Sequence, residues 1–196
     1  FRSPLPEHHT PSRHGLVYSE NPFPQQANNT MNSPFLVTPQ WLAQHINDEN
    51  LVVIDVRMSP VGLTPKKDML AEFERGHIPG AVYFDIDEVA DKNTALPHML
   101  PTAAEFGAAV GKLGISERDT LVIYDEGNQF SAPRGWWTFR NFGAERVYVL
   151  DEGLNGWTAQ GQALATGPAQ PAPQTFNARF NADAVVDMRQ VEQALG

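Results

Sequence analysis

The chain has 196 residues, enough for one compact domain of about 100–150 residues with further segments. Its composition, 41% hydrophobic and 19% charged, is typical of a soluble globular protein, and no apolar run approaches the roughly 18–20 residues of a membrane span. The formal net charge of −9 argues against nucleic acid and acidic lipid as partners, because both are bound by clustered Lys and Arg. Without cysteine, the chain can form no disulfide, thiolate metal site or persulfide.

Residues 1–30 are rich in Pro, His, Asn and Ser and show no sustained period, so we interpret them as an irregular extension whose origin, native or added, stays open. Three histidines lie there, His8, His9 and His14. An irregular segment does not hold metal ligands in a fixed geometry, and we predict no metal site. We place the folded domain at residues 34–161.

The first predicted element is a short amphipathic helix that begins at Thr38 and Pro39, an N-cap followed by proline at the first helical position. Its apolar side recurs at helical spacing through Trp41, Leu42, His45 and Ile46. Residues 51–56 form an apolar, β-branched run that is typical of a buried parallel strand. A helical turn over residues 68–74 and a short strand over residues 82–84 are expected to follow.

The second half of the domain begins with a capping box, Thr102 and Glu105, which predicts a helix that ends at Gly114. We expect a strand over residues 121–124, a helix from Pro133 to Gly143, a strand over residues 146–150 and a helix over residues 154–159. Strands that alternate with helices predict an α/β fold with a mostly parallel central sheet and helices on both faces. In such folds, function resides at the carboxyl ends of the strands.

Beyond Gly161 the composition changes to Ala, Pro, Gln and Gly, which sustains neither a helix nor a central strand. We interpret residues 162–175 as a Pro/Ala-rich linker. Residues 176–196 resemble a chain that enters a new domain, so we predict that they are the start of a truncated second domain.

The segment Phe-Glu-Arg-Gly-His-Ile-Pro-Gly-Ala-Val-Tyr-Phe, residues 73–84, resembles the first loop of rhodanese-like proteins and implies a rhodanese-like fold. Two roles are open for His77 in it. The residue can hold the turn through a local hydrogen bond, or it can line an active site formed with a second domain, as the mercaptopyruvate branch of the family implies. Asp68 is the nearest candidate for an acidic partner of His77. The alternative is that Asp68 is an exposed carboxylate on the face of a helix.

The segment from Tyr124 to Trp137 resembles the N-terminal domains of two-domain mercaptopyruvate and thiosulfate sulfurtransferases, which lack the nucleophile. In a catalytic rhodanese domain a cysteine opens this loop, and backbone N–H groups and a helix N-terminus stabilise its thiolate. Asp125 takes that place here. A carboxylate can occupy the same cradle but cannot keep a sulfane sulfur as a persulfide. The resulting pseudo-active-site loop comprises Asp125, Glu126, Gly127, Asn128, Gln129, Phe130, Ser131 and Arg134.

For Arg134 we expect an ion pair with Asp125 or Glu126, and binding of an anionic donor is the alternative. Ala-Leu-Pro-His-Met-Leu-Pro, residues 95–101, also resembles these N-terminal domains. We expect His98 and Met99 to pack near a domain interface without a catalytic role.

The resemblance runs from about residue 37 to residue 180 and is strongest to the bacterial mercaptopyruvate type. It implies a cytoplasmic sulfurtransferase that moves sulfur from 3-mercaptopyruvate or thiosulfate, through a cysteine persulfide in a second rhodanese domain, to a thiol or cyanide. The implied partners are that second domain and a small anionic sulfur donor, with no metal or organic cofactor. This chain would be the inactive half. A catalytically inactive rhodanese module that serves protein interaction or regulation is the alternative.

Overall fold

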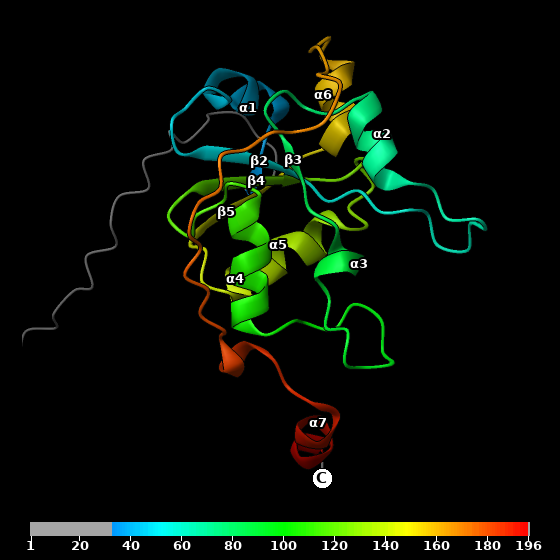
Figure 1. Cartoon of the computed structure of the whole chain (residues 1–196), viewed down its shortest axis with the longest axis vertical. Coiled ribbons are helices and arrows are strands. Elements are labelled where there is room, and N and C mark those ends of the chain that lie inside the picture. The colour runs from blue at the N-terminus through cyan, green and yellow to red at the C-terminus, as the bar shows by residue number, and fades with distance from the viewer. Residues whose placement is uncertain (1–32, 196) are drawn as a thin grey trace, which may run out of the picture. The chain divides into compact units, whose positions relative to one another are not determined.

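The computed structural model describes residues 33–195, so the predicted extension and its three histidines lie outside the described residues. Within that range the chain forms a five-stranded sheet in the order β1-β5-β4-β2-β3 (Figure 1). The strands are β1 (Leu36–Val37), β2 (Leu51–Asp55), β3 (Val82–Tyr83), β4 (Thr120–Tyr124) and β5 (Arg146–Leu150). Every neighbouring pair is parallel, which confirms the predicted parallel α/β fold.

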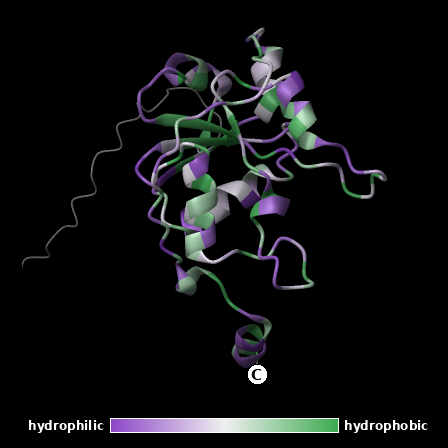
Figure 2. Cartoon of the chain, viewed as in Figure 1, coloured by the Kyte–Doolittle hydropathy of each residue, from purple (hydrophilic) through white to green (hydrophobic). Residues whose placement is uncertain are grey.

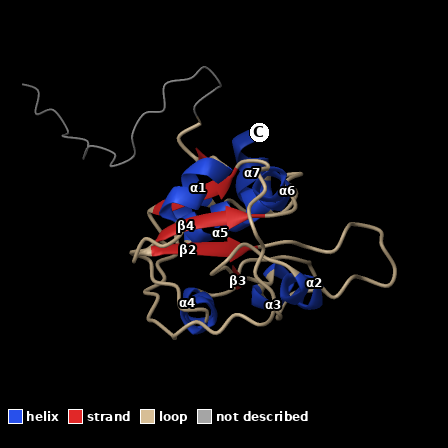
Figure 3. Cartoon of the chain, turned by 90° about the horizontal axis from the view of Figure 1, so that it is seen from above, coloured by secondary structure: helices blue, strands red, loops and turns tan. Residues whose placement is uncertain are grey.

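The register of the central pair positions the candidate site. Leu51 pairs with Thr120 at one end of β2 and β4, and Asp55 pairs with Tyr124 at the other. Because parallel strands carry their carboxyl ends to one edge, the residues that follow β2 and β4 emerge side by side (Figure 3).

Helices cover both faces of the sheet (Figure 1). One layer contains α1 (Pro39–His45), α2 (Met69–Arg75) and α6 (Gly153–Ala159), and the other contains α3 (Ile86–Val89), α4 (Ala103–Lys112) and α5 (Ala132–Asn141). A 3-10 turn, η1 (Ala182–Ala184), and α7 (Met188–Leu195) end the described chain. Among these helices none is long and apolar enough to cross a membrane.

The main core lies between the sheet and the layer of α3, α4 and α5, and the apolar strands stand out in Figure 2. Alternate residues of the strands, such as Ile54 and Ile123, face it, as the two-residue period of a strand requires. Aromatic rings fill its centre, where Phe106 stacks on Phe142 with the ring centroids 4.2 Å apart. The remaining strand positions, including Asp55 and Tyr124, face the layer of α1, α2 and α6.

The local helix signals have the structural roles that the sequence predicts. Thr102 and Glu105 form both hydrogen bonds of a capping box, and the Thr38 side chain accepts from the amide of Trp41 at the start of α1. The sequence did not indicate β1 or α3, because two to four residues are too few to show a period.

The segment that the sequence presents as a linker and the start of a second domain instead packs along the first domain. Phe176 is 5% exposed and lies in the main core, with its ring centroid 5.5 Å from that of Phe106. The amide of Gln174 donates to the carbonyl of Gly111 at 2.9 Å, and the amide of Arg179 donates to the carbonyl of Phe142 at 2.9 Å. Residues 162–181, called the strap below, therefore pack against the rhodanese-like domain, and the predicted linker bounds of 162–175 stay a prediction. A second domain that begins later, within residues 182–196, stays a prediction.

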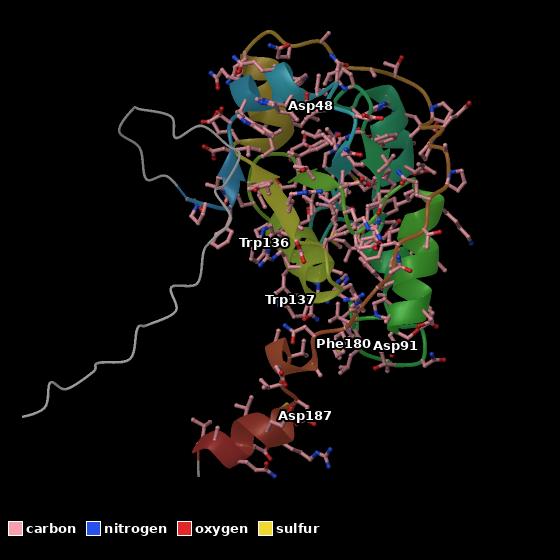
Figure 4. All side chains as sticks on the ribbon, turned by 90° about the vertical axis from the view of Figure 1, so that its left-hand side faces the viewer. Asp48, Asp91, Trp136, Trp137, Phe180 and Asp187 are labelled. Carbon is pink, nitrogen blue, oxygen red and sulfur yellow. The ribbon has the colours of Figure 1, made fainter. Side chains whose placement is uncertain are left out.

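Two glycines of α4 explain how the strap approaches so closely. A Cβ atom added to Gly107 would lie 2.7 Å from the carbonyl oxygen of Phe176, and one added to Gly111 would lie 2.6 Å from that of Gln174. Near the end of the strap, the ring of Phe180 lies with its centroid 5.6 Å from that of Phe142, and the amide of Asn181 donates to the carbonyl of Asn141 at 2.9 Å. Figure 4 labels Phe180.

Candidate functional site

Asp125 follows β4 directly and is buried beneath the loop that leads into α5. Its Oδ1 accepts from the amide of Gly127 at 2.8 Å, and its Oδ2 accepts from the amides of Ser131 at 3.1 Å and Ala132 at 3.0 Å. Ser131 is the N-cap of α5 but makes no side-chain cap, so the Asp125 carboxylate satisfies the start of this helix instead. The anion cradle is filled by a side chain of the same chain.

Backbone hydrogen bonds from the first turn of α6 hold the start of the same loop. The amides of Leu154 and Asn155 donate to the carbonyls of Asp125 and Glu126 at 2.9 and 3.2 Å. Gly127 adopts a φ of +119°, and a Cβ atom there would lie 2.3 Å from the carbonyl oxygen of Glu152. Only glycine fits this position, so the loop path depends on it.

The outer part of the loop faces solvent and borders a hollow of about 410 Å³. Glu126, Asn128, Phe130 and Ser131 line it from the loop, and Arg57, Met58 and Met69 line it from the opposite side. The Phe130 side chain is 50% exposed, and Gln129 adopts a left-handed φ of 53°. The hollow therefore combines apolar walls with carboxylates and an arginine.

His77 lies on the turn that follows α2 and is 5% exposed. Its ring stacks on Phe73 with the centroids 4.0 Å apart, and its Nδ1 lies 2.9 Å from the carbonyl oxygen of Phe73. The backbone of His77 also forms an antiparallel bridge with Ala165 of the strap. These contacts match the local hydrogen-bonding role that the sequence left open, and they leave Nε2 for other partners.

Asp68 is exposed at the start of α2, which fits the alternative of an exposed carboxylate on a helix and not a pairing with His77. Asp68 is the N-cap of α2, and its Oδ1 accepts from the amide of Ala71 at 3.0 Å. His77 lies beyond the other end of the same helix, whose seven residues span about 10 Å. The group that bonds Nδ1 of His77 is a backbone carbonyl.

Arg134 does not make the predicted ion pair with Asp125 or Glu126. Its guanidinium donates to the carbonyl of His98 and lies over the ring of Trp137, 4.8 Å from the ring centroid. Asp125 already has three amide donors, and Glu126 instead lies 3.7 Å from Arg57. Burial lowers the pKa of Arg134. The His98 side chain pairs with Asp87 of α3 at 2.8 Å. Together with the contact from Arg134 of α5, this pair holds the 95–101 loop against α3 and α5.

A buried polar network that the sequence analysis missed connects the two loops. The guanidinium of Arg57 contacts both carboxylate oxygens of Asp55, with Nε at 3.1 and 2.9 Å and Nη2 at 2.8 Å. The hydroxyl of Tyr124 donates to Oδ2 of Asp55 at 2.7 Å. The signal for it was Asp-Val-Arg at the end of a buried strand, where charged residues are otherwise rare.

Arg57 and Tyr124 of this network have raised pKa values. Burial alone would lower the pKa of Arg57, but the hydrogen bond and charge of Asp55 outweigh it, so that pKa is raised. Burial, and then the Asp55 charge, raise the pKa of Tyr124 well above its ordinary value. Tyr124 thus keeps its proton and remains the donor to Asp55.

Comparison with known proteins agrees with this architecture. The family model for the rhodanese-like domain matches residues 38–160. The chain is 43% identical over 161 residues to the 3-mercaptopyruvate sulfurtransferase of Escherichia coli K12, covering 82% of this chain and 57% of the relative. It is 40% identical over 154 residues to the human 3-mercaptopyruvate sulfurtransferase, covering 74% of this chain and 50% of the relative.

A solved structure shows the same likeness. The crystal structure of the Escherichia coli 3-mercaptopyruvate sulfotransferase SseA superposes with a TM-score of 0.80 at 42% identity, covering 83% of this chain and 62% of that one. The chain thus spans about half to three-fifths of the length of these relatives. On its sequence and its fold, the chain belongs to the family of rhodanese-like domains.

Proposed function

We propose that this chain is the non-nucleophilic, N-terminal half of a sulfurtransferase that moves sulfane sulfur from 3-mercaptopyruvate or thiosulfate to a thiol or cyanide. The sulfur is carried as a cysteine persulfide on a second rhodanese domain. Relatives named as 3-mercaptopyruvate sulfurtransferases support the reaction class, and the share of their length that this chain covers leaves room for another domain.

The filled cradle of Asp125 is the observation that carries the proposal. Sulfur transfer through a persulfide requires a thiolate that attacks the sulfur donor and is regenerated afterwards. Asp125 occupies the loop position and its amide donors, and these 196 residues contain no cysteine. The nucleophile therefore has to come from another polypeptide segment.

The role that we assign to this half is to form one wall of the cleft in which the second domain works. The hollow beside the pseudo-active-site loop has exposed apolar side chains, with Phe130 at 50% and Val61 at 83%. Such side chains are suited to burial against a second domain. A small anionic donor is the second expected partner, and we retain the cytoplasmic location as part of the proposal.

The test compares this chain alone with the same chain joined to a rhodanese domain that carries the cysteine loop. We expect no thiocyanate from thiosulfate and cyanide, and no pyruvate from 3-mercaptopyruvate, with the 196-residue chain. We expect turnover with the joined protein and none when its loop cysteine is replaced by serine. Turnover by the cysteine-free chain above the uncatalysed rate would refute the proposal.

A module for protein interaction or regulation is a second candidate, because a filled cradle beside an exposed apolar wall also suits a surface that only binds. The reading frame that contains this chain separates the two. A neighbouring rhodanese domain whose loop begins with cysteine supports the sulfurtransferase, and its absence supports the binding module.

A further inference from the structure

The geometry assigns Arg57 a positioning role: with Asp55 and Tyr124, it fixes the backbone of His77 and thereby the direction of its ring. The ring then bonds the carbonyl of Phe73 through Nδ1 and leaves Nε2 for another partner. This inference rests on the proposed function and adds to it that His77 contributes to the site formed with the second domain. The network acts through the two peptide groups that flank His77.

The first of these peptide groups joins Gly76 to His77. Nη2 of Arg57 donates to the carbonyl of Gly76 at 2.9 Å. The amide of His77, on the other side of the same plane, donates to the carbonyl of Ala165 at 3.0 Å. A peptide group is planar, so bonds on both sides fix its rotation.

The second peptide group joins His77 to Ile78 and is fixed in the same way. Its carbonyl accepts from the amide of Ala165 at 2.9 Å. Its amide, from Ile78, donates to the hydroxyl of Tyr124 at 3.3 Å. With both planes held, φ and ψ of His77 are set, and so is the direction of its Cα–Cβ bond.

The side chain of His77 then has one defined tautomer. Nδ1 lies 2.9 Å from the carbonyl oxygen of Phe73, and a carbonyl only accepts. In the neutral ring Nδ1 therefore carries the hydrogen and Nε2 carries the lone pair. A histidine in this state can accept a proton or a hydrogen bond at Nε2.

Arg57 also connects the His77 turn to the loop of Asp125. Its Nη1 lies 3.7 Å from Oε2 of Glu126, and Asp55 and Tyr124 end the paired strands β2 and β4. A buried ion pair is costly unless its hydrogen bonds are complete, and it often contributes specificity of position instead of stability. Arg57 is 6% exposed and bonds groups from three segments, as a positioning role requires.

The test uses the 196-residue chain itself and the ¹⁵N signals of its histidine rings. His45 is a matched internal control, because its Nδ1 lies 2.8 Å from the carbonyl oxygen of Trp41 and its ring stacks on Trp41 at 4.2 Å. His45 thus shares the local pairing of His77 but has no contact with Arg57 or Tyr124. Wild-type His77 is expected to show the Nδ1–H tautomer when the ring is neutral.

Two variants remove parts of the network. Tyr124→Phe deletes one hydroxyl, and Arg57→Lys keeps the charge but cannot span both Asp55 and the carbonyl of Gly76. Both are expected to move the His77 signals toward those of an exposed histidine and to leave those of His45 in place. In Tyr124→Phe the amide of Ile78 should exchange hydrogen on the order of fivefold faster. Arg140→Lys is the control variant, since Arg140 also donates to a backbone carbonyl, that of Glu145.

Unchanged His77 signals in the folded Tyr124→Phe variant would overturn the inference, even if Arg57→Lys does not fold. The ring signals need no turnover, so this result is independent of the sulfurtransferase assay. Inactivity of the joined protein with an intact His77 signature would contradict the proposed function and leave the positioning role in place.

Discussion

Replacing Phe176 by alanine tests whether the strap is part of the domain. The ring is 5% exposed and lies among the rings of the main core, 5.5 Å from Phe106 and 6.4 Å from Phe139. Phe→Ala at a buried site costs about 3–5 kcal/mol, because apolar burial is lost and a cavity remains. For a domain of this size that corresponds to a decrease in Tm of roughly 6–20 °C.

Phe180→Ala is the matched control, since Phe180 belongs to the same strap and contacts Phe142 but is 44% exposed. With only part of its surface buried, we expect a loss of about 1 kcal/mol. Urea titration of both variants measures the free energy of unfolding. A loss below about 1 kcal/mol for Phe176→Ala, or equal losses for the two variants, would refute the assignment of the strap to the core.

Three further changes test contacts of the strap and the loop. Hydrogen bonds from the side chain and the amide of Asn177 lower the pKa of Glu117 from 4.5 to about 2. This contact therefore stabilises the fold fully above about pH 4.5, and the stabilisation is lost as the pH falls toward 2. Urea titrations of Glu117→Gln at several pH values should show a flatter dependence of the unfolding free energy on pH in this range. Gly111→Ala should lower the Tm, although alanine favours helices, because its Cβ would meet the carbonyl oxygen of Gln174; a higher Tm would contradict the close approach. Asp125→Ala should lower the free energy of unfolding by about 1–3 kcal/mol, because the three amides that donate to Asp125 lose their acceptor. Millimolar sulfate should raise the Tm of this variant but not that of the wild type. An equal response of the two proteins to sulfate would argue against an anion cradle.

The strands and helices of the domain were predictable because their determinants are local. Thr102 and Glu105 lie three residues apart and bond to each other, so the capping box is visible in the sequence. Residues 51–54 are apolar because a central parallel strand is covered on both faces of the sheet. Each of these signals lies within one turn or one strand.

The strap was not predictable in this way because its contacts are long-range and mostly made by the backbone. Asn177 bonds Glu117 across 60 residues, and Gln174 bonds Gly111 through main-chain groups that leave no side-chain pattern. Its Pro- and Ala-rich composition favours a linker by any local rule. The available signal lay elsewhere, in Gly107 and Gly111, four residues apart on one side of a helix that is otherwise a good alanine-rich former.

In the candidate site, too, the features set by local sequence were predictable and those set by long-range contacts were not. The place of Asp125 at the start of its loop follows from a strand, a turn and a helix in succession, which the sequence displays. The partners of Arg134 and His77 depend on which groups are already satisfied, and the sequence does not show this. Asp125 has no need of Arg134 because backbone amides saturate it, and His77 has no need of Asp68 because the carbonyl of Phe73 is one helical turn away.

Two buried carboxylates, Asp55 and Asp125, organise the loops at the carboxyl edge of the sheet. Asp55 is satisfied by a guanidinium and a phenol, and Asp125 by the amides at the start of α5. In open parallel sheets this edge is where ligands bind, and here its strongest anion position is already taken by a side chain. The same two carboxylates hold the loops that border the hollow and the turn that carries His77. The loop therefore forms an anion cradle at this edge and fills it with its own carboxylate. This filled cradle is the reason for the proposed supporting role beside a nucleophile from another segment.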